Sequence, residues 1–163
     1  MCLVKIKRSS RRRISVLYFE DIHIGYSSHV GDYQISKEEI IEVATRWDPQ
    51  PFHIDEQVAQ QSVFGGLVAS SLHLFAICTR LFFDHPDKIA VMAMLSKNAV
   101  KLPNPARPGD ILRYETRCIE RRASNKHQDR GIVVLSDTLT NADGEIILSQ
   151  EATLLVAANG SNE

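Results

Sequence analysis

Asp48 and His53 are the two residues of this sequence whose types and spacing best suit acid–base chemistry. The segment between them is Pro49-Gln50-Pro51-Phe52, and two prolines in three residues restrict the backbone strongly. A stiff loop can aim a carboxylate and an imidazole at one point, and histidine titrates near neutral pH. The same spacing also fits a simpler interpretation, in which Asp48 ends a helix before proline and His53 is a surface or core residue.

The adjacent glycines Gly65 and Gly66 precede the longest apolar stretch of the chain, Leu67 to Phe83. We expect them to open a long, buried helix. Free amides at a helix N-terminus, helped by the helix dipole, suit an anion or a polarised carbonyl oxygen. A tight turn without a ligand is the alternative. Ser70 either faces a pocket or bonds to the helix backbone.

The segment before the candidate dyad predicts the helix that must position it. Ser36 and Glu39 form a capping-box pattern, in which each side chain satisfies a free amide at the helix start. The helix then ends at Asp48, because Pro49 disfavours the helical conformation of the residue before it. Asp55 is expected to cap a short turn that follows.

The second half of the chain changes character and reads as strands. Four segments are rich in Val, Ile, Leu and Thr, and Asp143-Gly144 is a hairpin signal between the last two. With one earlier strand, the order predicts an α+β fold, a curved antiparallel sheet wrapped around a long central helix. The predicted strands are Tyr26–Tyr33, Ala90–Leu102, Ile111–Arg122, Gly131–Asn141 and Glu145–Ala157.

Length and composition fit one globular domain. The chain has 163 residues, is 44% hydrophobic and 24% charged, and carries a formal net charge of −1, which does not favour nucleic acid as a partner. The apolar stretch contains polar residues and lacks membrane flanks, so no membrane span is predicted. We expect a flexible basic tail over residues 1–16, the domain over 17–158 and a frayed end over 159–163.

The three cysteines are Cys2, Cys78 and Cys118, and no two of them lie close in sequence. An odd, scattered set favours free thiols in a reducing compartment and therefore a cytoplasmic protein. The set offers no zinc spacing, and the sequence lacks phosphate-binding and dinucleotide-binding motifs. We therefore expect neither a metal nor a cofactor.

The segment from Asp48 to Asp55, with Ala59 four residues further on, resembles the motif Asp-x-Asn-Pro-x-His-x-Asp/Glu of the MaoC-like dehydratase family. This family includes the R-specific, or type 2, enoyl-CoA hydratases. Residues 64–70 resemble the start of the family's central helix, and residues 97–110 resemble its strand and following turn. The likeness runs in order over roughly residues 18–157.

The resemblance implies a hot-dog fold and a homodimer, or a dimer of dimers, that binds an acyl-CoA or acyl-carrier-protein thioester. It implies that Asp48 and His53 hold a water that adds reversibly and in syn fashion to a trans-2-enoyl-CoA, giving an (R)-3-hydroxyacyl-CoA. The amide of Gly66 would bind the thioester carbonyl. The resemblance also places six residues at the substrate: Gln50, Pro51, Phe52, Phe64, Gly65 and Ser70.

Two positions depart from the family pattern. Gln50 replaces the motif's asparagine, and Gly65 replaces a histidine that often precedes the helix glycine. Both changes leave Asp48 and His53 in place and bear on the substrate more than on the reaction class. Two other functions stay open: a hot-dog acyl-CoA thioesterase and a non-catalytic protein that binds acyl-thioesters.

Overall fold

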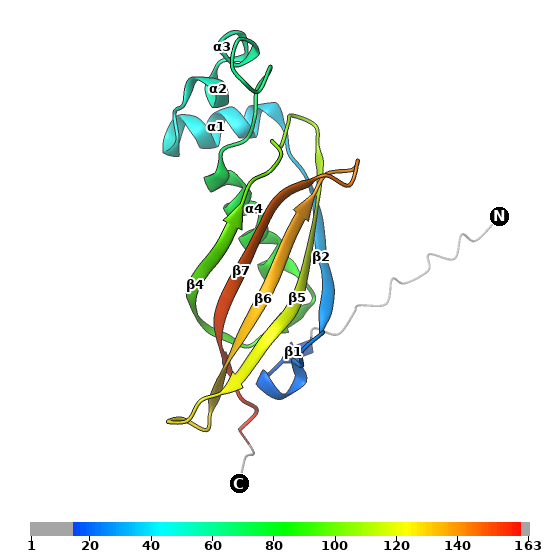
Figure 1. The fold of residues 1–163 in the computed structure, drawn as a ribbon, viewed down its shortest axis with the longest axis vertical. Coiled ribbons are helices and arrows are strands. Elements are labelled where there is room, and N and C mark those ends of the chain that lie inside the picture. The colour runs from blue at the N-terminus through cyan, green and yellow to red at the C-terminus, as the bar shows by residue number, and fades with distance from the viewer. Residues whose placement is uncertain (1–14, 161–163) are drawn as a thin grey trace, which may run out of the picture.

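A five-stranded antiparallel sheet forms the body of the protein (Figure 1). The computed structural model describes residues 15–160. The strand order is β2-β5-β6-β7-β4, and all neighbouring strands run antiparallel. Their bounds are β2 Ser27–Gln34, β4 Val91–Lys101, β5 Ile111–Ala123, β6 Arg130–Thr140 and β7 Ile146–Ala157. These five strands confirm the predicted ones, with ends shifted by at most one residue.

Alternating side chains give the sheet one buried face. Along β6, every second residue from Gly131 to Leu139 is buried, and its neighbours are partly exposed. Successive side chains of a strand point to opposite faces, so this pattern places one set against a core. Val133, Leu135 and Leu139 are almost fully buried there. Asp137 lies in the same inward series, which is unusual for a carboxylate.

Helix α4, Ser71–Asp84, packs across the concave face of the sheet (Figure 1). Leu74, Ile77, Cys78 and Leu81 recur at helical spacing and form its buried stripe. A curved antiparallel sheet around one long helix is the hot-dog fold that the sequence predicted. Within this chain the sheet covers only one side of the helix, because Leu72 and Phe83 on α4 are exposed.

The start of α4 differs from the prediction. Gly65 and Gly66 do not open the helix: they lie in a turn, and the chain runs on without regular structure to Ser70. Ser70 is the N-cap, and its hydroxyl accepts a hydrogen bond from the amide of Leu72. The apolar composition of residues 67–69 hid this boundary, because a buried extended segment is as apolar as a buried helix.

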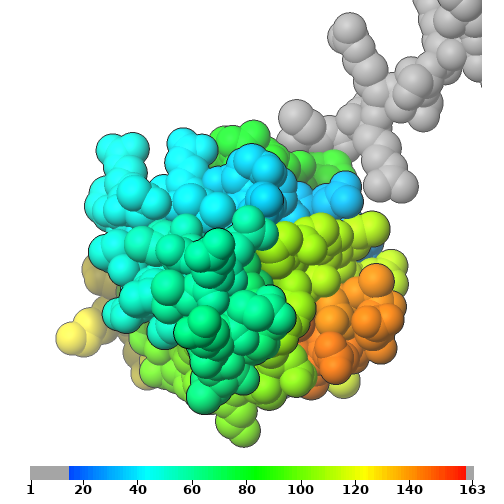
Figure 2. Space-filling model, turned by 90° about the horizontal axis from the view of Figure 1, so that it is seen from above, coloured from blue at the N-terminus to red at the C-terminus, as the bar shows by residue number. Residues whose placement is uncertain are grey.

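Three short helices gather at one end of the sheet, α1 at Lys37–Trp47, α2 at Pro51–Ile54 and α3 at Glu56–Gln60. Seen from that end, they cover the molecule beside the loop that follows β4 (Figure 2). As predicted, Ser36 caps α1 by accepting from the amide of Glu39, and Asp55 caps α3 by accepting from two amides. Helix α2 was not predicted.

The capping box at Ser36 is only half formed. The Glu39 carboxylate accepts from the Tyr33 hydroxyl and lies 3.2 Å from Nε2 of the buried His73. A contact between elements thus replaces the local one, and the hydrogen bond to Glu39 raises the pKa of Tyr33 to about 12.

The two ends of the described chain correct one detail of the domain prediction. Ser15 and Val16, expected in the basic tail, belong to β1 (Ser15–Leu17), which pairs in parallel with β3 (Asp87–Ile89). A short 3-10 helix, Phe19–Asp21, follows β1. The rest of the predicted tail and residues 161–163 lie outside the described residues. Among residues 15–160, no helix is both long and apolar enough to cross a membrane.

Candidate functional site

A hollow of about 260 Å³ opens beside Asp48 and His53. Its wall comes from four places: Asp48 itself, helix α2, the segment from Phe64 to the first turn of α4, and residues 102–106 after β4. These segments are far apart in sequence and meet at the end of the sheet that carries the short helices. The two residues selected by type and spacing therefore share one cavity wall.

Asp48 is the C-cap of α1, as Pro49 predicted. One of its carboxylate oxygens, Oδ2, accepts a hydrogen bond of 2.5 Å from the hydroxyl of Ser70. The same oxygen lies 3.6 Å from Nε2 of His53. The Asp48 side chain keeps 26% of its surface exposed, so it reaches the hollow while its position is fixed from behind.

His53 is buried, with 7% of its surface exposed, and its ring is held at both ends. Nδ1 lies 2.7 Å from the carbonyl oxygen of Val68. A carbonyl can only accept, so Nδ1 carries a proton, and in the neutral imidazole Nε2 is then the nitrogen with the lone pair. The 3.6 Å from Nε2 to Asp48 exceeds a hydrogen bond. One water molecule between the two groups can therefore contact both.

Backbone hydrogen bonds hold the extended segment before α4 in place. The amide of Val68 donates to the carbonyl of Phe52 on one side, and the amide of Ala69 donates to the carbonyl of Ala106 on the other. This fixes the Val68 carbonyl against His53 and the Ser70 hydroxyl against Asp48. The Phe52 ring packs edge-on against the imidazole, with ring centroids 4.5 Å apart.

The turn at Gly65 and Gly66 lies next to the hollow without lining it. Gly65 has a φ of +60°, in the left-handed region that favours glycine. A Cβ on Gly66 would lie 3.3 Å from Nη1 of Arg107, so the second glycine leaves room for this guanidinium. Arg107 Nη2 donates to the Phe64 carbonyl at 2.7 Å and thereby ties the turn to the loop after β4.

The remaining predicted substrate residues divide between the cavity wall and its support. Phe52 and Phe64 line the hollow, whereas Gln50 and Pro51 are exposed at the start of α2. Ser70 is buried and bonds to Asp48 rather than facing the cavity. Sequence reasoning missed the wall formed by Leu74 and residues 102–106. The prolines after β4 had predicted only a turn there, and nothing in the sequence indicated that this turn lines a cavity.

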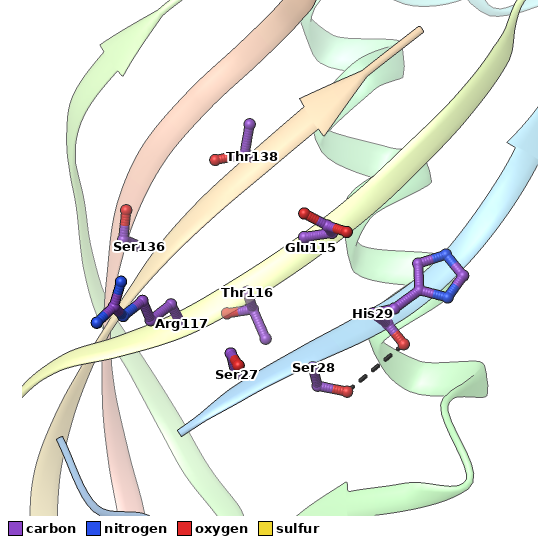
Figure 3. A pocket seen from close by; sticks show the side chains of 8 residues that line it. All are labelled: Ser27, Ser28, His29, Glu115, Thr116, Arg117, Ser136 and Thr138. Atoms are coloured by element: carbon purple, nitrogen blue, oxygen red, sulfur yellow. Dashed lines mark hydrogen bonds between the residues drawn. The ribbon is translucent and has the colours of Figure 1, made fainter. Parts of the chain in front are cut away.

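A second, shallow hollow of about 380 Å³ lies over β2, β5 and β6, on the sheet face away from α4 (Figure 3). Glu115, Arg117 and His29 are its charged or titratable residues, and all three are exposed. Solvent screens such groups, so this face offers little control of proton transfer. Among residues 15–160, no three His, Cys, Asp or Glu side chains group as metal ligands.

Comparison with known proteins gives a matching family model and similar structures. The family model for the MaoC like domain matches residues 25–139. A MaoC-like dehydratase from Rhodospirillum rubrum is 32% identical, with a TM-score of 0.82 over 88% of this chain and 98% of that one. The uncharacterised protein YdeM of Bacillus subtilis is 24% identical over 84% of this chain and 96% of its own length.

An R-hydratase from Pseudomonas aeruginosa, PhaJ1, shares the fold at 17% identity. Its TM-score is 0.70, over 87% of this chain and 86% of that one. The match to the family model covers well over half of the chain and includes Asp48, His53 and the Gly65-Gly66 turn. The chain therefore belongs to the family of proteins with a MaoC-like domain.

Proposed function

We propose that this protein is a hydratase, or in reverse a dehydratase, that acts on acyl-thioesters. The observation that carries the proposal is the placement of the Asp48 carboxylate 3.6 Å from His53 Nε2 at the wall of one hollow. General acid–base catalysis needs two proton-transfer groups aimed at one reacting molecule. Family membership supports the same reaction class.

Asp48 and His53 would be the catalytic residues. In hydration, the water between them loses a proton to one of the two groups as its oxygen bonds to C3 of a trans-2-enoyl thioester. A proton is delivered to C2 on the same face, which gives an (R)-3-hydroxyacyl thioester. The overall change is the addition of one water molecule. The bond from His53 Nδ1 to the Val68 carbonyl leaves Nε2 free to take part.

The amide of Gly66 is the proposed donor to the thioester carbonyl oxygen, where negative charge develops as water adds. This amide forms no backbone hydrogen bond within residues 15–160. Gly66 therefore acts from the turn beside the hollow and not from a helix N-terminus. Arg107, which packs against the turn, helps to hold it.

The proposed substrate is an enoyl thioester, on a CoA or an acyl carrier protein. The R-hydratase among the structural relatives supports the reaction class. We further propose a homodimer. In the single chain, four large apolar side chains of α4 and β4 are exposed to solvent, and a second copy of the chain would cover them. They are Leu72, Phe83, Met92 and Leu95. A cytoplasmic location, expected from the cysteines, belongs to the same proposal.

The test is to incubate the purified protein with trans-2-enoyl-CoAs and follow the enoyl absorbance and free thiol separately. The proposal predicts loss of enoyl absorbance without thiol release, and a product of R configuration. Thiol release would indicate the alternative thioesterase. Binding of enoyl-CoAs without any turnover would indicate a non-catalytic acyl-thioester-binding protein.

A further inference from the structure

A small hollow of about 60 Å³ lies between α4 and the inner face of the sheet. Most of its lining is apolar, as expected for a space beneath a core helix. The hydroxyl-bearing Thr79 and Tyr114 also line it, and three polar side chains of the sheet, Lys97, Asp137 and Gln150, meet at its wall. They come from β4, β6 and β7, three strands that are neighbours in the sheet.

Hydrogen bonds link the three groups into a chain. Asp137 is 2% exposed and accepts at one oxygen from Thr116 Oγ1 at 2.8 Å and at the other from Gln150 Nε2 at 3.0 Å. Gln150 Oε1 accepts in turn from Lys97 Nζ at 3.0 Å. Two donors thus satisfy the Asp137 carboxylate, and Lys97 reaches it only through a neutral amide.

Lys97 therefore has hydrogen-bonding capacity to spare. An ammonium group carries three N–H donors, and one of them bonds to Gln150. Lys97 Nζ also lies 5.0 Å from the centroid of the Phe75 ring, a contact that uses its charge but no lone pair. Within residues 15–160, no carboxylate lies within ion-pair distance of this ammonium. A cation that faces a cavity with unused donors suits an oxygen acceptor.

This hollow and the one at the dyad lie along the same two elements. On α4, Leu74 lines the first hollow and Cys78 lines the second, one helical turn or ~6 Å further on. On β4, Leu102 follows the last residue of the strand and lines the first hollow, and Lys97 lines the second, five residues or ~17 Å away. An acyl chain that entered beside His53 and continued between α4 and β4 would arrive at Lys97.

We propose that the hollow at Lys97 receives the far end of the acyl chain, and that this end carries an oxygen acceptor, a carboxylate or a hydroxyl, in place of a methyl group. This inference rests on the proposed function, since it assumes an acyl-thioester at the dyad. A hollow with a mostly apolar lining and a cation at its wall favours chains that are apolar along their length and polar at the tip. A methyl tip would leave the Lys97 donors unpaired, which costs binding energy.

Binding is the direct test, because it needs no turnover. Saturated acyl-CoAs of equal chain length that end in a carboxylate, a hydroxyl or a methyl group are titrated by calorimetry into the full-length protein, over a series of lengths. At the best length, one of the two oxygen-terminated ligands should bind about tenfold more tightly than the methyl-terminated one. Whichever of the two binds more tightly shows whether the oxygen acceptor is a carboxylate or a hydroxyl.

Three variants assign any such preference to Lys97. Lys97→Met keeps the length of the side chain and should abolish the preference, whereas Lys97→Arg should retain it. Lys101→Met is the matched control, because Lys101 is exposed at the end of the same strand and lines neither hollow. If Lys97→Met fails to fold, Lys97→Gln replaces it, as it removes the charge and keeps a polar group.

Equal or tighter binding of the methyl-terminated ligand by the wild-type protein would overturn the inference. A preference that Lys97→Met leaves unchanged would also overturn it. Failure of this inference differs visibly from failure of the proposed function. In the first case methyl-terminated enoyl-CoAs are hydrated and Asp48→Asn stops the reaction; in the second case no enoyl-CoA of any kind is hydrated.

Discussion

Asp48 and Asp137 are two carboxylates with different surroundings. Each lies at the wall of one of the two hollows beside α4. Asp48 ends α1, stays partly exposed and receives a hydrogen bond from Ser70 at one oxygen. Asp137 lies in the middle of β6, is buried and receives donors at both oxygens. Both are held by hydroxyl groups, but within residues 15–160 a histidine nitrogen lies close to Asp48 and none lies within ion-pair distance of Asp137.

The difference separates a group that can exchange protons from one that is fixed in place. Burial raises the pKa of Asp137, while the hydrogen-bonding groups of Thr116, Gln150 and Tyr114 and the charge of Lys97 lower it and so favour the charged form. Each donor that holds Asp137 offsets part of the cost of burying a charge. Asp48 needs less help, because water reaches it. In our account, the chain uses Asp48 for chemistry and Asp137 to hold a polar cluster at the substrate's far end.

The largest predicted effect is at Asp48. Asp48→Asn removes a proton-transfer group without changing the side chain's size, so enoyl-CoA hydration should fall at least about a hundredfold. Steady-state kinetics check this. Asp55→Asn is the control, because Asp55 caps α3 and does not line the hollow. Comparable activity in the two variants would show that Asp48 is not special among the carboxylates of this region.

Ser70→Ala should have the next largest effect on activity. The variant removes the donor to Asp48 Oδ2, and we expect the rate to fall about tenfold because a charge-assisted hydrogen bond no longer positions the carboxylate. Ser70 also caps α4, so the free energy of unfolding should drop by about 1 kcal/mol. The control Ser36→Ala removes the cap of α1 and should lose similar stability with normal activity. Equal activities would exclude a positioning role for Ser70.

Thr116→Val should affect stability and leave hydration intact, in contrast to Ser70→Ala. It deprives the buried Asp137 of one donor, which should cost about 1–2 kcal/mol near neutral pH. Urea unfolding measures the loss. Thr138→Val is the matched control, because Thr138 lies on the outer face of the neighbouring strand.

The loss in Thr116→Val should depend on pH. Since the pKa of Asp137 is raised on folding, the folded protein holds this proton more tightly than the unfolded chain. The contribution of Asp137 to the free energy of unfolding therefore falls as the pH rises from about 3.9, its pKa in the unfolded chain, through its higher pKa in the folded protein. Without Thr116 the folded pKa rises further, so the difference from wild type should be larger at about pH 7 than at about pH 4. A pH-independent difference would mean that Asp137 stays protonated throughout.

The smallest effect concerns Cys78, which lines the hollow at Lys97. Burial, with a smaller contribution from the nearby Asp137 charge, raises the pKa of its thiol to about 12. The thiolate is the reactive form, so iodoacetamide at about pH 8 should leave Cys78 unmodified in the native protein and alkylate it after denaturation. Peptide mapping by mass spectrometry separates it from Cys2 and Cys118. Rapid native alkylation would show that this hollow is open and polar.

The pairing of Asp48 with His53 was preferred to a simpler interpretation only with the help of the family resemblance. The sheet and the end of α1, in contrast, could be predicted from the sequence because each rests on local rules. Strand alternation and Pro49 act within a few residues, and so do the caps at Ser36 and Asp55. What escaped prediction depends on tertiary contacts. The Glu39 side chain contacts Tyr33 and His73 instead of capping its own helix. Helix α4 begins only at Ser71, because residues 67–69 are held between two other segments. Lys97 and Asp137 come to the same hollow only because their strands lie in one sheet.

The claim that Asp48 and His53 act together is tested most directly at His53. His53→Ala should lower the rate of enoyl-CoA hydration at least about a hundredfold, while binding of a saturated acyl-CoA stays within a few-fold of wild type. His29→Ala, a change on the outer face of the sheet, should leave the rate unaltered. Hydration at a wild-type rate by folded His53→Ala would contradict the account, because the imidazole that lines the hollow at the proposed water site would then be dispensable.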